Sequence, residues 1–243
     1  MSGASAESRA AAAQEALAAE RAVAWTDFAL GIEAGVFAVL IARHQEAGHT
    51  TIKGPVVTFF AATAAASLAG AALHGLTRDQ EDPRRRALWR FALGSIGLAS
   101  VSSWFLGARL ALAGEASRSV PRVATIAHVP YFAVVLSGDR PFGTAIASYV
   151  PGALFLGGSL ASRLRDRRDR RSAATALVAL LITFAAAGVQ VRRIGLSRRF
   201  DHNALYHALQ AIGIAVFYRA ATDMLGTVGP RSSVPAAQAV GRH

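Results

Sequence analysis

The feature that most constrains this chain is a series of apolar runs, each about as long as a membrane-spanning helix, separated by short charged loops. Of its 243 residues 53% are hydrophobic and 17% are charged, whereas soluble domains carry about 25% charged residues. We therefore predict an all-α fold, an integral membrane bundle of seven transmembrane helices that occupies residues 22–221. The seven predicted spans are Ala22–Ala42, Pro55–Leu76, Ala87–Ala113, Arg118–Ser137, Phe142–Ser162, Ala173–Val191 and His202–Ala221.

The segments that flank this bundle have a different composition. Residues 1–21 favour helix but carry no apolar stripe, so we expect a polar lead-in. They lack the basic start and short apolar core of a cleavable signal peptide, and we expect the first span to serve as its own targeting signal. Residues 222–243 are rich in Gly, Pro, Ser and Arg, which is typical of a disordered tail.

Charge and cysteine content exclude several classes of function. The formal net charge of +11 comes from 25 Arg and the single Lys53, and the arginines flank apolar runs. Membrane lipids with anionic head groups are therefore the expected partners, and nucleic acid is not. The absence of cysteine excludes disulfides, thiolate metal ligands and cysteine nucleophiles. No predicted span contains lysine, which excludes a retinal Schiff base.

Polar residues of distant spans are predicted to meet near one membrane face. An odd-numbered span starts on the N-terminal face, and an even-numbered span ends there. Asp27 therefore lies near the same face as a set of polar residues from the other spans: His74, Arg90, Gln190, Asn203 and His207. Polar side chains within spans face other helices or a cavity, so this convergence predicts an intramembrane site.

Each cluster at this face also has a simpler interpretation. His74 ends a stripe with Ser67 at helical spacing, and it is either a metal ligand or a histidine that caps a helix end. Asn203 and His207 lie four residues apart on one face, and they either bind a ligand or form a hydrogen-bonded layer that holds the bundle in register. Asp27 is a helix-start charge, or it pairs with Arg90, or it orients a histidine.

The start of the last span resembles a known motif. Asp201-His202-Asn203-Ala204-Leu205-Tyr206-His207 is similar to the Asp-x-His-Ala-Leu-Trp-His run of a superfamily that contains alkaline ceramidases, adiponectin/progestin receptors and GPI-lipid-remodelling proteins. These are seven-helix membrane proteins, many of them zinc-dependent hydrolases of lipid amides or esters. The resemblance implies a divergent bacterial member in the cytoplasmic membrane.

The resemblance also implies a zinc site. In that superfamily one histidine at the end of span two and two at the start of span seven hold the metal. His74 and His207 match two of these positions, and Asn203 stands at the third, with His202 beside it as a substitute. The superfamily's serine and aspartate have counterparts only in Ser67, seven residues before His74, and in Asp27 of span one, because span three contains no aspartate.

Two functions from different classes follow as hypotheses. The first is a zinc-dependent hydrolase of a lipid amide or ester, in which His74, His207 and Asn203 or His202 hold zinc, and Asp27 or Ser67 positions the attacking water. The second is a non-enzymatic bundle that binds a lipid or small molecule and uses its polar layer for packing and specificity. A proton-coupled carrier that uses Glu33 and His128 ranks last, because no pair of broken helices or internal repeat is evident.

Overall fold

Seven α-helices make up the computed structural model, which describes residues 3–44, 52–77 and 81–227. The prediction of an all-α fold is confirmed for this part of the chain. The helices are α1 (Gly3–Arg43), α2 (Lys53–Leu76), α3 (Pro83–Ala111), α4 (Ala116–Ser137), α5 (Phe142–Arg163), α6 (Arg170–Arg192) and α7 (His202–Thr227).

Six of the seven helices are long and apolar enough to cross a membrane, and the chain is an integral membrane protein on this ground. They are α1 to α6, in the part of the chain that is described. Helix α7 has 26 residues, so its length is sufficient, but it is not among the six. Its first three turns carry Asn203, Tyr206, His207 and Gln210, which reduce its hydropathy.

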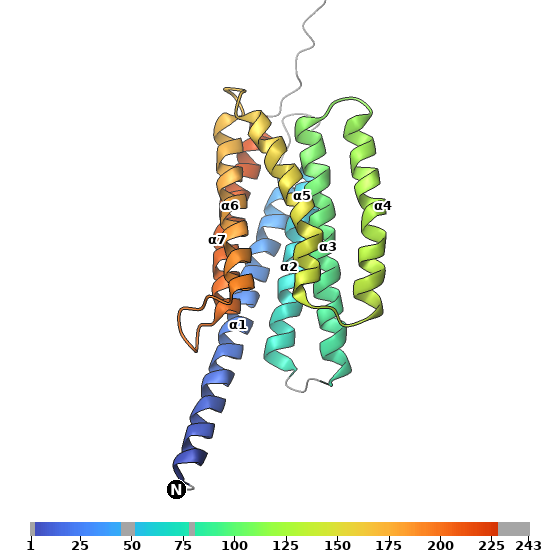
Figure 1. Ribbon diagram of the computed structural model, residues 1–243. Coiled ribbons are helices and arrows are strands. Elements are labelled where there is room, and N and C mark those ends of the chain that lie inside the picture. The colour runs from blue at the N-terminus through green and yellow to red at the C-terminus, as the bar shows by residue number, and fades with distance from the viewer. Residues whose placement is uncertain (1–2, 45–51, 78–80, 228–243) are drawn as a thin grey trace, which may run out of the picture.

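Six helices form a closed ring, in which each packs against the next in the order α1, α2, α3, α5, α6, α7 and back to α1 (Figure 1). Short connections make consecutive helices antiparallel neighbours, except that α4 and α5 do not pack on each other. Helix α4 stands outside the ring against α3, and the turn before Phe142 returns the chain so that α5 also packs on α3. We call the end where α7 begins the near end, at the bottom of Figure 1, and the opposite end the far end.

The far end of the ring is filled by a hydrophobic cluster, which we call the plug. Its largest fully buried side chain is Phe60 of α2, which is 0% exposed. The Phe60 ring contacts the rings of Phe37, Phe217 and Tyr218, and Phe37 stacks on Tyr218 with centroids 4.2 Å apart. Leu30 of α1 and Ile214 of α7 mark its limit towards the near end. All six helices of the ring contribute to the plug, so it holds the ring together.

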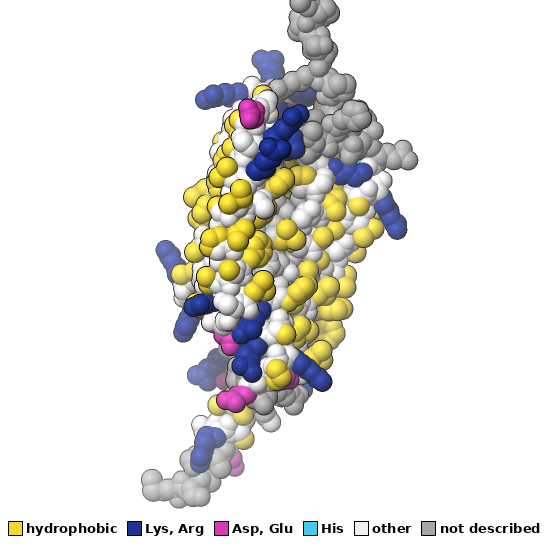
Figure 2. All heavy atoms as spheres, turned by 90° about the vertical axis from the view of Figure 1, so that its right-hand side faces the viewer, with side chains coloured by type: hydrophobic (Ala, Val, Ile, Leu, Met, Phe, Trp, Pro, Cys, Tyr) yellow, Lys and Arg dark blue, Asp and Glu magenta, His cyan; other side chains and the backbone are white. Residues whose placement is uncertain are grey.

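The outer surface of the bundle is apolar. On α4, which faces the viewer in Figure 2, Val123, Ile126 and Val129 are more than half exposed. Hydrophobic side chains cover the middle of this face, and most of the arginines lie towards its two ends. A surface of this kind is unfavourable in water and is the one that a bilayer solvates.

The predicted boundaries of the bundle differ from the structure at both ends. Residues expected to form a separate lead-in belong to α1, a continuous helix of 41 residues whose first turns project from the near end (Figure 1). Ala and Glu favour helix strongly, which explains why the helix extends beyond the apolar run. Helix α7 continues to Thr227, past the predicted end at Ala221. The rest of the predicted disordered tail, residues 228–243, lies outside the described residues.

Candidate functional site

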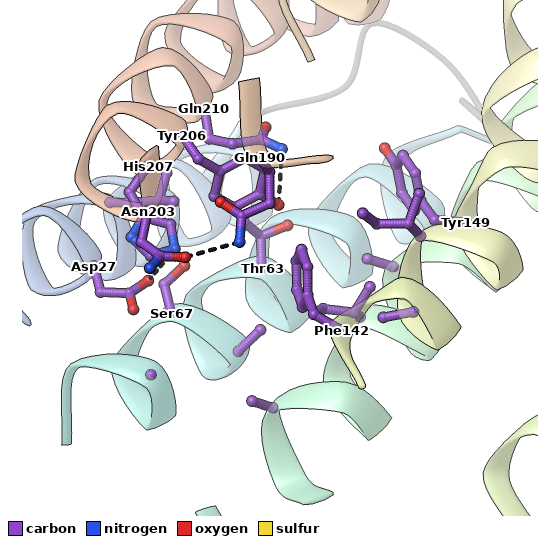
Figure 3. Close-up of a pocket in the computed structure, with 18 of the residues that line it drawn as sticks. Asp27, Thr63, Ser67, Phe142, Tyr149, Gln190, Asn203, Tyr206, His207 and Gln210 are labelled. Carbon is purple, nitrogen blue, oxygen red and sulfur yellow. Dashed lines mark hydrogen bonds and ion pairs between the residues drawn. The ribbon is translucent and has the colours of Figure 1, made fainter. Parts of the chain in front are cut away.

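A cavity of about 590 Å³ lies inside the ring, between the plug and the near end. All six ring helices line it, and most of the lining side chains are apolar. Polar side chains from α1, α2, α6 and α7 gather on one wall, and Phe142 and Tyr149 of α5 lie opposite (Figure 3). Its volume is within the range of about 300 to 1,000 Å³ that is usual for small-molecule sites.

The start of α7 is fixed by Asp201. Its Oδ1 accepts hydrogen bonds from the backbone N–H groups of Asn203 and Ala204, both at 3.0 Å. A carboxylate in this position caps the helix and satisfies donors that have no partner within it. Asp201 therefore sets where α7 begins and, through the helical repeat, which way Asn203 and His207 point.

A layer of amide and phenol groups continues from Asn203. Gln190 of α6 donates from Nε2 to Asn203 Oδ1 at 2.8 Å, which ties α6 to α7 across the cavity wall. One turn further along α7, Gln210 donates to the hydroxyl of Tyr206 at 3.2 Å. Gln190 Oε1 is buried and has no hydrogen-bond partner in the described part of the chain.

Asp27 and His207 form the most buried contact between an acid and an imidazole in the site. Asp27 is 4% exposed, and its Oδ1 lies 3.3 Å from His207 Nε2. The carboxylate fits there because residue 70 of α2 is glycine: a Cβ at Gly70 would overlap with Asp27 Oδ2. The other ring nitrogen, Nδ1 of His207, is buried without a hydrogen-bond partner among the residues described.

The structure places the residues proposed from the sequence as follows. Asp27, Ser67, His74, Asn203 and His207 all line the one cavity. Figure 3 shows Asp27, Ser67, Asn203 and His207 close together and pointing towards one another.

His202 and Arg90 do not join this group. His202 is not among the residues that line the cavity, and its Nδ1 lies 3.9 Å from a carboxylate oxygen of Asp201. Arg90 lies 3.3 Å from Asp139, so the basic partner of Asp27 is His207 and the alternative pairing of Asp27 with Arg90 was wrong.

The two cavity histidines each face an acid. His74 Nδ1 lies 2.7 Å from Glu20 Oε2, which comes from the projecting part of α1. His207 faces Asp27 as described above. In the described ranges no three His, Asp or Glu side chains converge closely enough to hold a metal ion. The side chains as placed do not form a zinc site, and the zinc set remains a prediction from the resemblance.

His128 belongs to a different part of the bundle. Its Nδ1 lies 2.7 Å from Ala124 O, and its Nε2 lies 3.0 Å from Ser100 Oγ on α3. Ser100 in turn donates to Ser148 O of α5 at 2.9 Å. His128 therefore has partners for both ring nitrogens and joins α4 to the ring, away from the cavity. Glu33 of α1 does not line the cavity either.

Sequence reasoning missed several residues that border the cavity. Gly70 is one of them, because the absence of a side chain there makes room for Asp27. Arg85, Arg86 and Trp89 line the cavity at the start of α3. The rule that placed Asp27 and His74 at the N-terminal face also placed Arg90 there, at the start of the third span. The same argument could have included Trp89 and the two arginines that come just before that span.

Comparison with known proteins gives one match. Residues 22–225 match the model of the DUF6962 family, which is described as a family of unknown function. Neither a curated protein nor a solved structure matches the chain. The matched region begins near the point where α1 enters the bundle and ends in the last turn of α7, so it includes the whole ring and the cavity. The chain belongs to the DUF6962 family.

Proposed function

We propose that this protein binds a lipid-like small molecule inside the bundle. The apolar part of the ligand lies towards the plug. Its polar part lies at the polar residues of α6 and α7 in the cavity wall, which we call the Asn203–His207 layer: Gln190, Asn203, Tyr206, His207 and Gln210. One observation carries the proposal: a cavity of about 590 Å³ whose walls are mostly apolar and whose polar groups gather on one side. A site with apolar walls and a few convergent polar groups suits an amphipathic ligand.

The polar layer supports this proposal because the protein leaves it incomplete. His207 Nδ1 and Gln190 Oε1 are both buried without a partner among the described residues. An acceptor that is desolvated and unpaired costs about 1 to 3 kcal/mol, so structures seldom keep one without a reason. A ligand, or a water molecule that accompanies it, supplies a donor if these side chains shift slightly towards the cavity.

The proposal is tested by filling the cavity with a larger side chain and measuring whether a probe still binds there. Ala187 of α6 lines it, whereas Leu181 on the same helix is 65% exposed on the outer surface. The purified full-length chain is irradiated with a long-chain alcohol that carries an alkyl diazirine, and the labelled peptides are identified. We expect labelling of cavity residues in the wild type and in Leu181→Phe, and its loss in Ala187→Phe. Equal labelling of all three at the same peptides would contradict a cavity ligand.

A second candidate function is hydrolysis of the bound lipid at an amide or ester bond, as the resemblance implies. The observation that favours it is that Asp27, Ser67, His74, Asn203 and His207 share one cavity. The measurement is zinc content of the purified chain, wild type against His74→Ala and His207→Ala. About one equivalent in the wild type, lost in both variants, supports a metal hydrolase. If zinc is absent and His207→Gln folds normally, the layer serves binding and packing.

We also propose that α7 crosses the bilayer as the seventh span and that the protein resides in the bacterial cytoplasmic membrane. Support for the crossing comes from the ring, because α7 packs antiparallel to α6 and closes the ring against α1. Its polar residues line the cavity, so they are shielded from lipid.

A further inference from the structure

Two arginines border the near end of the cavity. Arg85 and Arg86 lie in the first turn of α3, and both line the cavity. Arg85 is half-buried, and its Nη1 donates to the backbone oxygen of Thr77 at 3.1 Å, with two longer contacts of 3.5 Å to Thr77 Oγ1 and Leu73 O. Arg86 is exposed. Neutral oxygens thus hold Arg85 in place without compensating its charge.

The acids that line the cavity already have basic partners. Asp27 faces His207, and Asp139 lies 3.3 Å from Arg90. Within the described ranges no carboxylate lies within ion-pair distance of Arg85 or Arg86. Two adjacent positive charges therefore border a mostly apolar cavity with no described carboxylate within ion-pair distance, an arrangement that attracts an anion.

The position of Trp89 indicates where Arg85 and Arg86 lie relative to the lipid head groups. Trp89 follows Arg85 by one turn of α3, lines the cavity, and donates from Nε1 to Arg140 O at 2.7 Å. Tryptophan in membrane proteins is enriched at the level of the lipid head groups. Arg85 and Arg86 come before Trp89 in α3 and so lie at that level or outside it, where the polar end of an inserted lipid would be.

The length of the cavity suits one acyl chain. Ala99 is a deep lining residue on α3, and it follows Arg85 by a helical rise of roughly 21 Å. The hydrocarbon part of one bilayer leaflet is about 15 Å thick. A chain of the length found in membrane lipids therefore reaches the plug while its head remains beside the arginines.

We propose that the ligand is a single-chain amphiphile with an anionic head, a carboxylate or a phosphate, bound by Arg85 and Arg86 with its chain in the cavity. This inference rests on the proposed function and specifies its ligand class. Guanidinium groups bind such heads through charge-assisted, often bidentate, hydrogen bonds. The Asn203–His207 layer binds the rest of the polar part of the ligand, directly or through a water molecule that accompanies it.

The experiment compares two probes on the purified full-length chain in a neutral detergent without phospholipid. One is a long-chain fatty acid that carries an alkyl diazirine, and the other is the alcohol of the same chain and diazirine position. We expect the acid to label the wild-type cavity at about tenfold lower concentration than the alcohol, the factor typical of an added charge-assisted contact. Ala187→Phe should abolish labelling by both probes.

Three arginine variants then test the assignment. Arg85→Gln and Arg86→Gln should each raise the concentration of the acid that is needed for labelling. In the double variant this concentration should equal that of the alcohol. Labelling by the alcohol should not change, which also shows that the variants fold. Arg84→Gln is the matched control, because Arg84 is an exposed neighbour on the same turn that does not line the cavity.

The other outcomes separate the two proposals. If acid and alcohol label the wild type equally, or if Arg84→Gln weakens the acid as much as the other changes do, the anionic head is wrong although a cavity ligand remains. If inorganic phosphate at millimolar concentration displaces the acid, the arginines bind a small anion and the amphiphile is wrong. If neither probe labels the cavity, the proposed function itself is contradicted.

Discussion

The carboxylate of Asp27 and the imidazole of His207 face each other across the interface between α1 and α7, with Oδ1 3.3 Å from Nε2. These residues are 180 positions apart in the chain, and their contact is one of those that close the ring. Both are polar groups buried in a membrane-embedded bundle, and the contact between them offsets part of the free-energy cost of burying each.

Breaking this pair on one side is predicted to destabilise the protein, because the remaining partner stays buried without compensation. We expect His207→Leu and Asp27→Leu each to cost about 3 to 5 kcal/mol, and the double variant to cost far less than their sum. Unfolding in denaturing detergent, followed by circular dichroism, measures this cycle. The Arg90–Asp139 pair is the control. It is partly exposed, so a double-mutant cycle on it should give a coupling free energy of about 1 kcal/mol or less. Additive losses for Asp27 and His207 would show that the two side chains do not interact.

Gly70→Ala is predicted to displace Asp27, because the added methyl group would overlap with its carboxylate. We expect a loss of about 1 to 3 kcal/mol, which is typical of overpacking. Gly94 of α3 and Gly188 of α6 have open space at the Cβ position, so alanine there should gain about 0.4 to 1 kcal/mol. In an Asp27→Ala background the same Gly70→Ala change should cost much less than it does in the wild type, because the carboxylate that the methyl group would meet is gone. If it does not, the methyl group conflicts with something other than Asp27.

Single cysteines can locate the ends of α7, since the chain contains no cysteine of its own. Ser197 lies in the loop before α7, and Gly226 lies in its last turn; both are exposed. We expect a membrane-impermeant maleimide to reach Ser197→Cys and Gly226→Cys from opposite sides of the membrane. Arg167→Cys, in the loop between α5 and α6, should label from the same side as Gly226→Cys. Labelling of positions 197 and 226 from the same side would mean that α7 does not cross.

His128→Ala is predicted to loosen α4 without disturbing the ring. The imidazole joins α4 to Ser100 of α3, and α4 lies outside the ring against that helix. We expect a cost of about 1 to 3 kcal/mol from the lost hydrogen bond and the space left behind. Hydrogen exchange followed by mass spectrometry should accelerate in α4 and remain unchanged in α6 and α7. A uniform increase along the chain would assign His128 a role in the whole bundle.

The positions of the helices could be predicted because the signal is strong. Apolar runs of about 20 residues alternate with short arginine-rich loops, and a hydrocarbon environment allows only helices in such runs. The turn before Phe142 and the start of α7 at His202 were both predicted correctly. The first helix was harder, because Ala-rich polar sequence continues a helix with no change in apolarity to mark its beginning.

Counting spans predicted that the polar residues converge at one face, but it did not predict which side chains contact each other. Whether Asp27 meets His207 or Arg90 depends on how each helix is rotated about its axis, and one residue changes that angle by 100°. The contact between His74 and Glu20 requires α1 to begin before Ala22, which the apolar run did not indicate. The position of α4 outside the ring was equally hidden, since its hydropathy is like that of α5.

The plug limits how a molecule bound in the cavity could move across the membrane. Phe60 and the rest of the plug occupy the ring between the cavity and the far end. A molecule at His207 could reach the far end only if the packed side chains of the plug moved apart. The ring, as described, therefore forms a cup that is closed towards the far end.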